Sequence, residues 1–267
     1  MRYSSVAVVF FMVSAQAAPG VPTDLKFEVA TLKHSPPLRP GDNGPFGIRS
    51  APGGVRYQAG QCPLNVMLTV AFHIKTDQIV GAPEWAASDH FDMNAKAEKP
   101  STIDELHMML INLLIERFHM KYHMEKKELP VYGLSVDKDG PKLPNKHDGP
   151  ETSGKTWIDV EGKRFPQAIW HATFSPMSYF VFRLSQIMDR PVIDLTNLPG
   201  TYDFDLSFTR ELPPNIPETA MVNGAPIDTS GPTIYEALRR QLGLKLERQK
   251  GPVDMMVIDH IEKLSEN

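Results

Sequence analysis

The chain has 267 residues, of which 41% are hydrophobic and 22% are charged, an ordinary composition for a globular protein with one large core or two modest ones. Its formal net charge of −4 excludes the basic character typical of nucleic-acid-binding proteins, so no nucleic-acid partner is expected. The 24 prolines lie between the periodic segments rather than inside them, which indicates stiff loops.

The N-terminus has the order of a secretory signal peptide. Arg2 provides a positive end, residues 6–15 form an apolar run, and Ala15-Gln16-Ala17 is a small-x-small cleavage motif. We therefore expect a signal peptide over residues 1–17, cleaved after Ala17, and an exported protein that is periplasmic or extracellular. The alternative is an uncleaved membrane anchor, but the run is shorter than the roughly 20 residues that span a bilayer. No later segment is long and apolar enough to span a bilayer, so the cleaved chain is expected not to span a membrane.

The first half of the cleaved chain alternates strands with two amphipathic helices. Pro63 begins the first helix, because apolar residues recur after it at helical spacing. Thr102 and Glu105 form a capping box that begins the second helix. Period-two alternation and turn residues predict strands at residues 26–31, 55–59, 91–97, 118–125 and 131–136.

The second half shows the same order of elements. Pro176 begins a helix, and Thr233 with Glu236 forms a second capping box. Gly243 is predicted to end this last helix in a left-handed conformation. Strands are predicted at residues 202–208, 244–247 and 253–258.

Matching order, matching caps and nearly matching spacing predict a tandem duplication. An amphipathic helix needs a sheet to cover its apolar stripe, and the alternating strands are typical of antiparallel sheets with one wet face. The predicted fold class is therefore α+β, with two tandem β-α-β-α-β-β modules, each a small, mainly antiparallel sheet with two helices on one face. We assign residues 18–136 to the first module, 137–155 to a linker and 156–267 to the second module.

Short motifs along the whole cleaved chain are similar to the signatures of one family. They are Phe27-Glu28-Val29-Ala30, residues 78–85, 91–97, 127–132, 140–143, 190–194 and 200–204, and Val257-Ile258-Asp259-His260. On these motifs the chain resembles the soil-associated family of exported proteins of unknown function (domain of unknown function 3738), which is abundant in acidobacteria. Residues 160–173 depart from the pattern. The resemblance carries over no catalytic residue and no cofactor, because none is established for the family.

The second module is also similar to the short N-terminal domain of secretins and TonB-dependent receptors. The residues that carry this likeness are Asp194, Leu198, Gly200, Leu238, Leu242, Gly243 and Leu244. Domains of that kind bind partner proteins in the cell envelope and are not enzymes, so the resemblance implies an envelope protein or peptide as partner. Related domains attached to membrane peptidase sensors imply an alternative role as an extracytoplasmic sensor.

Two groups of polar residues are candidates for chemical sites. His119 and His123, followed by Glu125, would share a metal ion if they lay on a helix. The local alternation predicts a strand instead, where residues four apart are separated by roughly 13 Å, so no metal site is predicted. Asp203 and Asp205 share the solvent-exposed face of their predicted strand. This position favours ordinary surface carboxylates over a pair for acid–base catalysis.

Three further features have a structural and a functional interpretation. Cys62 is the only cysteine and precedes a helix start, which favours a structural thiol over a reactive one. The glycine-rich residues 41–47 lack the strand–loop–helix context of a phosphate loop. The three tryptophans, Trp85, Trp157 and Trp170, lie in predicted loops or short extended segments, where plugging a core edge is favoured over anchoring a ligand.

These observations predict no catalytic, cofactor-binding or metal-binding residue. The favoured function is a non-catalytic cell-envelope binding or protein-interaction module. A secreted hydrolase with dispersed catalytic residues and a sensor that works with a membrane peptidase are the alternatives.

Overall fold

The computed structural model describes residues 24–38, 47–50, 53–143, 145–147, 155–160, 166–212, 216–217, 220–222 and 224–264. The predicted signal peptide with its cleavage site at Ala17, and most of the glycine-rich segment 41–47, lie outside these residues. Within them the fold is α+β with mainly antiparallel sheets, which confirms the predicted fold class. None of the helices in the described part of the chain is long and apolar enough to cross a bilayer. The predicted module boundaries stay a prediction.

The elements follow the predicted order with one correction: the strands predicted separately at residues 118–125 and 131–136 form one continuous strand, and so do those at 244–247 and 253–258. The elements of the first half come first. They are β1 (Val29–His34), β2 (Gly47–Ser50), β3 (Gly54–Pro63), α1 (Leu64–Phe72), the 3₁₀ turn η1 (Thr76–Gln78), β4 (Ile79–Val80), α2 (Trp85–Ser88), β5 (His90–Ser101), α3 (Ile103–Arg117) and β6 (Lys121–Val136).

The second half also follows the predicted order and adds strands at its start. Its elements are β7 (Asn145–His147), β8 (Lys155–Val160), β9 (Gln167–Pro176), α4 (Met177–Ile187), β10 (Val192–Asp194), β11 (Thr201–Thr209), β12 (Met221–Val222), β13 (Ala225–Pro226), α5 (Ile234–Ala237), the π-helical turn η2 (Leu238–Leu242) and β14 (Leu244–His260). β7 lies within the segment assigned to the linker, where it pairs with β11.

Both helix starts that follow a proline are built in the same way. Pro63 and Pro176 each occupy the N-cap position, with φ/ψ of −64°/151° and −67°/150°. Two residues earlier, Gln61 and Phe174 have positive φ angles of 47° and 46°. In each half a carboxylate from the neighbouring strand accepts a hydrogen bond from that residue's backbone N–H, over 3.0 Å to Asp92 and 2.8 Å to Asp203.

The capping boxes and the helix end at Gly243 are confirmed. The Thr102 and Thr233 hydroxyls accept from the backbone N–H groups of Glu105 and Glu236, whose side chains bond back to the cap residues. Gly243 ends the last helical segment with a φ of 65°. The two halves therefore repeat their local geometry as well as their order of elements.

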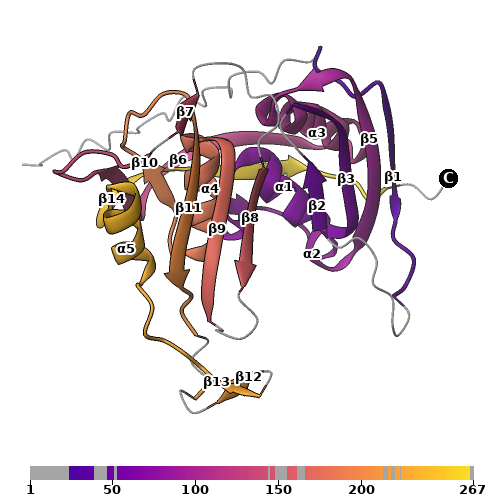
Figure 1. Ribbon diagram of the computed structural model, residues 1–267. Helices are drawn as coiled ribbons and strands as arrows, with labels where there is room; N and C mark the ends of the chain where they lie inside the picture. The colour runs from indigo at the N-terminus through magenta and orange to yellow at the C-terminus, as the bar shows by residue number, and fades with distance from the viewer. Residues whose placement is uncertain are drawn as a thin grey trace, which may run out of the picture.

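The two halves are joined by a long antiparallel ribbon of β6 and β14. These strands pair from Leu244 with Val136 at one end to His260 with Lys121 at the other. Figure 1 shows the ribbon running across the molecule, from the sheet β7-β11-β9-β8 of the second half toward the sheet β1-β5-β3-β2 of the first. β10 pairs in parallel with the end of β6, and β4 pairs in parallel with the end of β14.

As a result, the C-terminal part of each ribbon strand packs into the core of the other half. Met256 and Ile258, near the C-terminus, pack into the core formed by β3, α1, β5 and α3. Tyr132 and Leu134, at the end of the first half, pack into the core formed by β9, α4, β11 and α5. The two cores therefore share their strands, so neither is complete within a contiguous half of the sequence.

Candidate functional site

A cleft of about 780 Å³ opens in the second half, within the size range of pockets that hold small ligands. The residues that line it come from the end of α4, the end of β11, the start of α5 and the ribbon. They are Tyr132, Gln186, Ile187, Met188, Asp189, Phe208, Thr209, Arg210, Glu211, Leu212, Thr229, Gly231, Thr233, Ile234, Tyr235 and Arg248. Another hollow, of about 660 Å³, lies in the first half near His34, Gln61 and Lys263.

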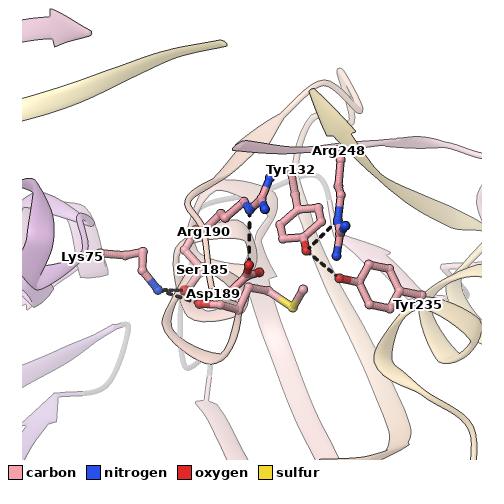
Figure 2. A network of polar contacts seen from close by, with 8 residues as sticks. Lys75, Tyr132, Ser185, Asp189, Arg190, Tyr235 and Arg248 are labelled. Atoms are coloured by element: carbon pink, nitrogen blue, oxygen red, sulfur yellow. Dashed lines mark hydrogen bonds and ion pairs between the residues drawn. The ribbon is translucent and has the colours of Figure 1, made fainter. Parts of the chain in front are cut away.

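Two tyrosine hydroxyls and one guanidinium meet at the wall of the larger cleft. The Tyr235 hydroxyl donates to the Tyr132 hydroxyl over 2.8 Å, and the Arg248 Nε–H donates to the same oxygen over 3.4 Å. Figure 2 shows these three side chains converging from β6, β14 and α5. The register of the ribbon brings Arg248 beside Tyr132, because the two residues are cross-strand partners. The rings of Tyr132 and Tyr235 contact edge to face.

Burial and hydrogen bonding determine the ionisation of this cluster. Tyr132 is only 1% exposed. Burial, followed by the hydrogen bond to Tyr132, raises the pKa of Tyr235, so its hydroxyl stays protonated. Burial acts to raise the pKa of Asp189 as well, but hydrogen bonds from Tyr132 and Arg190 outweigh it and the net pKa is lowered. The cluster therefore holds a protonated Tyr235 beside the Asp189 carboxylate and the guanidinium groups of Arg190 and Arg248.

Lys75 fixes the floor of this region from the first half. Its Nζ donates to the carbonyl oxygens of Ser185 and Met188, each over 2.7 Å (Figure 2). These carbonyls end α4, where a cation also offsets the negative end of the helix dipole. Burial lowers the pKa of Lys75. A second bond across the halves, from Gln186 Nε2 to the Ile74 carbonyl over 3.1 Å, holds the same helix end.

Arg248 is the notable cation of the cleft. Within the described part of the chain no carboxylate lies within ion-pair distance of its guanidinium, although Arg190 pairs with Asp189 over 3.2 Å. A guanidinium has a planar fork of donors that matches a carboxylate or phosphate. The cleft therefore offers a guanidinium that forms no ion pair with a carboxylate of the described residues, although its pKa is raised by the hydrogen bond to Tyr132 and, to a lesser extent, by nearby Asp189.

The polar residues weighed from the sequence do not converge on this cleft. His119 has a φ of 47° and precedes β6, so its assignment to the strand was wrong; its ring pairs with Glu262 over 3.1 Å. His123 bonds Asp259 through Nδ1 and Glu125 through Nε2, and these hydrogen bonds raise its pKa. The nitrogens of His123 thus point to different carboxylates.

The two aspartates of β11 have separate structural partners. Asp203 holds the backbone N–H of Phe174, and Asp205 lies 2.6 Å from the ring of His171. They do not form a carboxylate pair. Cys62 is 1% exposed and burial raises its pKa to about 12, in agreement with a structural role.

The tryptophans were predicted in loops or short extended segments, and only the helical position of Trp85 differs from that prediction. Trp85 begins α2, and Trp157 and Trp170 belong to β8 and β9. Trp170 is completely buried, packed against Phe180. Trp85 stacks on Phe118 of the first core. For these two residues, the preference for a core role over a ligand anchor is supported.

The cleft residues were missed in the sequence because nothing local marks them. Tyr132 and Tyr235 are 103 residues apart, and Tyr132 and Arg248 are 116 apart. Arg248 directly follows the predicted strand 244–247, but no sequence pattern placed that strand beside Tyr132. A metal-ligand geometry was missed as well, in the group of His73, Asp104 and His107, whose ligand atoms all lie within 4.8 Å of one another.

Comparisons with known proteins add one match. A family model described as "Protein of unknown function (DUF3738)" matches residues 65–261. No curated protein and no solved structure matches the chain.

Proposed function

Because the chain belongs to the family of proteins of unknown function DUF3738, its function has to come from its own residues, and we propose that it is an exported binding module whose cleft beside Tyr132, Tyr235 and Arg248 holds a peptide through a carboxylate group. The observation that carries this proposal is the guanidinium of Arg248, which has a tyrosine hydroxyl but no carboxylate as its partner among the described residues.

The cleft suits recognition of an anion. A carboxylate accepts two parallel hydrogen bonds from a guanidinium, and such charge-assisted bonds are about twice as strong as neutral ones. The Tyr235 hydroxyl donates to the Tyr132 hydroxyl, which in turn accepts from Arg248, so the two tyrosines hold the guanidinium in place. Phe208 and Ile234 give the same cleft an apolar wall for the adjacent side chain of a peptide.

The site is also rigid. Tyr132 is buried in the long ribbon, and Lys75 and Gln186 lock the end of α4 to the first half. Donors held in place lose little conformational entropy when a ligand binds, which favours binding.

Export and an envelope partner remain part of the proposal. The apolar run at residues 6–15 with its motif at Ala17 supports secretion, and the likeness of the second half to the short N-terminal domain of secretins and TonB-dependent receptors supports a protein or peptide partner in the envelope. The N-terminal residue of the protein recovered outside the cytoplasm tests this directly. A mature chain that begins at Ala18 supports export, and one that retains Met1 contradicts it.

The binding proposal is tested with short peptides that differ only at their C-terminus. We expect free-acid peptides to bind and their C-terminally amidated forms to bind at least about tenfold more weakly, measured by calorimetry. Arg248→Lys should weaken binding of the free-acid peptide, because a lysine cannot supply the planar fork. Tyr235→Phe should also weaken that binding, because it removes the hydroxyl that bonds Tyr132 beside Arg248. Arg240→Gln, which removes an exposed arginine outside the cleft, is the matched control.

Two outcomes contradict this function. Equal affinity for the free-acid and amidated peptides would show that the cleft does not recognise the C-terminal carboxylate. Turnover of peptide, ester or glycoside substrates by the purified chain, lost in Tyr235→Phe, would favour the hydrolase alternative.

A further inference from the structure

Two histidines and an aspartate meet where α1, α3 and α4 come together. Asp104 and His107 lie three residues apart on α3, so their side chains share one face of the helix. His73 is the C-cap of α1, and its φ of 53° belongs to the left-handed region. The His73 Nε2 lies 2.8 Å from the His107 Nδ1.

The His73 ring is held between two elements. It stacks on Phe182 of α4 with 4.8 Å between centroids, and the edge of the His107 ring meets it from α3 at the same distance. Tyr179 contacts both imidazoles. Aromatic packing on both sides therefore fixes the direction of the imidazole nitrogens, two of which form the hydrogen bond between the rings.

The imidazole pair is not a completed hydrogen-bond network. His107 is 3% exposed, yet its Nε2 has no hydrogen-bond partner in the described part of the chain. Buried polar atoms without partners are uncommon because each costs about 1–3 kcal/mol. Burial, with the neighbouring His73 as a smaller cause, lowers the pKa of His107 to about 3, so the ring is neutral. Burial lowers the pKa of His73 as well, against the pull of Asp104.

The distances suit a metal ion. All three ligand atoms lie within 4.8 Å of one another, and the carboxylate of Asp104 is on the exposed side. Donors of a tetrahedral ion at about 2.0–2.1 Å are about 3.3 Å apart. His73 Nε2 and His107 Nδ1 are 2.8 Å apart, so an ion would replace their hydrogen bond and separate them by about half an ångström. We propose that His73, Asp104 and His107 bind one divalent transition-metal ion of the Zn²⁺ class, with a position left open toward solvent.

The choice of ion follows from the donors. Two imidazoles and one carboxylate are the ligands of zinc and of other first-row divalent ions, whereas Mg²⁺ and Ca²⁺ prefer oxygen alone. Among the described residues no other group of three such side chains gathers its ligand atoms in this way. Bound there, the ion would join the end of α1 to the start of α3.

The test titrates Zn²⁺ alone into the tag-free, chelator-treated chain. We expect one ion per chain, a higher thermal midpoint in its presence, and no response to Mg²⁺. Asp104→Asn, at an exposed position, should leave the midpoint of the metal-free protein nearly unchanged. Its zinc affinity should fall by more than about 10-fold, because removal of even an outer partner costs about 10–100-fold. His107→Phe should abolish binding.

Co²⁺ supplies an independent readout, since its visible absorption reports the ligands directly. The spectrum should change on Asp104→Asn and vanish on His107→Phe. Asp205→Asn is the matched control, because it removes a carboxylate that lies 2.6 Å from His171 elsewhere on the surface. Zinc affinity that is absent in the unaltered chain, or that falls equally in Asp205→Asn, would overturn the proposal.

Discussion

His107 shows how strongly the surroundings of a single side chain determine its chemistry. The residue is polar and titratable, yet it lies in the first core among Tyr57, His73 and Tyr179. Its position on α3 follows the predicted helix, but its burial could not be predicted, because α1 and α4 cover that face and come from elsewhere in the chain. The same holds for Tyr132, because Tyr235 and Arg248, which bond its hydroxyl, lie more than a hundred residues away in the sequence.

The metal-free protein should lose stability in mild acid because of His107. Burial lowers its folded-state pKa to about 3, below the unfolded value of about 6.5. The unfolded chain therefore binds the extra proton between these values, so the contribution is complete above pH 6.5 and is lost as the pH falls toward 3. At about 1.4 kcal/mol per pH unit, the free energy of unfolding should fall by about 2 kcal/mol between pH 6.5 and 5.

Urea unfolding at several pH values measures this dependence. His107→Phe should flatten the curve, whereas His90→Ala, which removes an exposed histidine, should leave its slope unchanged. His123 acts in the opposite direction, since its hydrogen bonds to the Asp259 and Glu125 carboxylates raise its pKa, and its contribution to stability is lost at higher pH. An unchanged slope in His107→Phe would contradict the assignment.

At the scale of elements, local signals predicted the fold well. Proline N-caps, capping boxes and Gly243 act through backbone groups within a few residues, so a sequence displays them directly. The strand β9 (Gln167–Pro176) was not predicted from the sequence, and a bulge at Phe174 interrupts it near its end. That bulge depends on a hydrogen bond to Asp203 of the neighbouring strand, and the local sequence pattern cannot predict such a contact.

Asp203 should accordingly matter more to stability than its neighbour Asp205. Its Oδ1 accepts from the Phe174 N–H, and removal of the carboxylate leaves that backbone group without its partner. Asp203→Ala should lower the free energy of unfolding by about 1–3 kcal/mol, and Asp203→Asn, which keeps an acceptor oxygen, by less. Asp205→Ala, on the same strand and 70% exposed at its side chain, is the control and should change it little. Chemical denaturation compares the three, and equal losses at both positions would refute the bulge argument.

At the scale of the molecule, the order of elements was predictable but the exchange of last strands was not. Residues 131–136 and 253–258 were both predicted as strands, and both are. Which core each strand completes depends on pairing between residues that lie far apart in sequence, and periodicity carries no information about it. β6 and β14 therefore link the two cores rather than closing each one separately.

Met256 tests this exchange. It lies near the C-terminus but is completely buried in the first core. Met256→Ala should cost about 2–5 kcal/mol, the range for large-to-small changes in a core. The loss should appear in the fluorescence of Trp85, which stacks in that first core, and in the circular dichroism of the whole chain at the same denaturant concentration. Met221→Ala, at a 65% exposed position, is the control. Separate transitions for the two probes would show that the halves unfold independently.

The crossed ribbon also sets an order of events during biosynthesis. The first core contains Ile258, so it stays incomplete until the ribosome has synthesised that residue, long after helices α1 and α3. A nascent chain in that condition has exposed apolar helices and an unpaired β6, which makes it a substrate for chaperones rather than a finished domain.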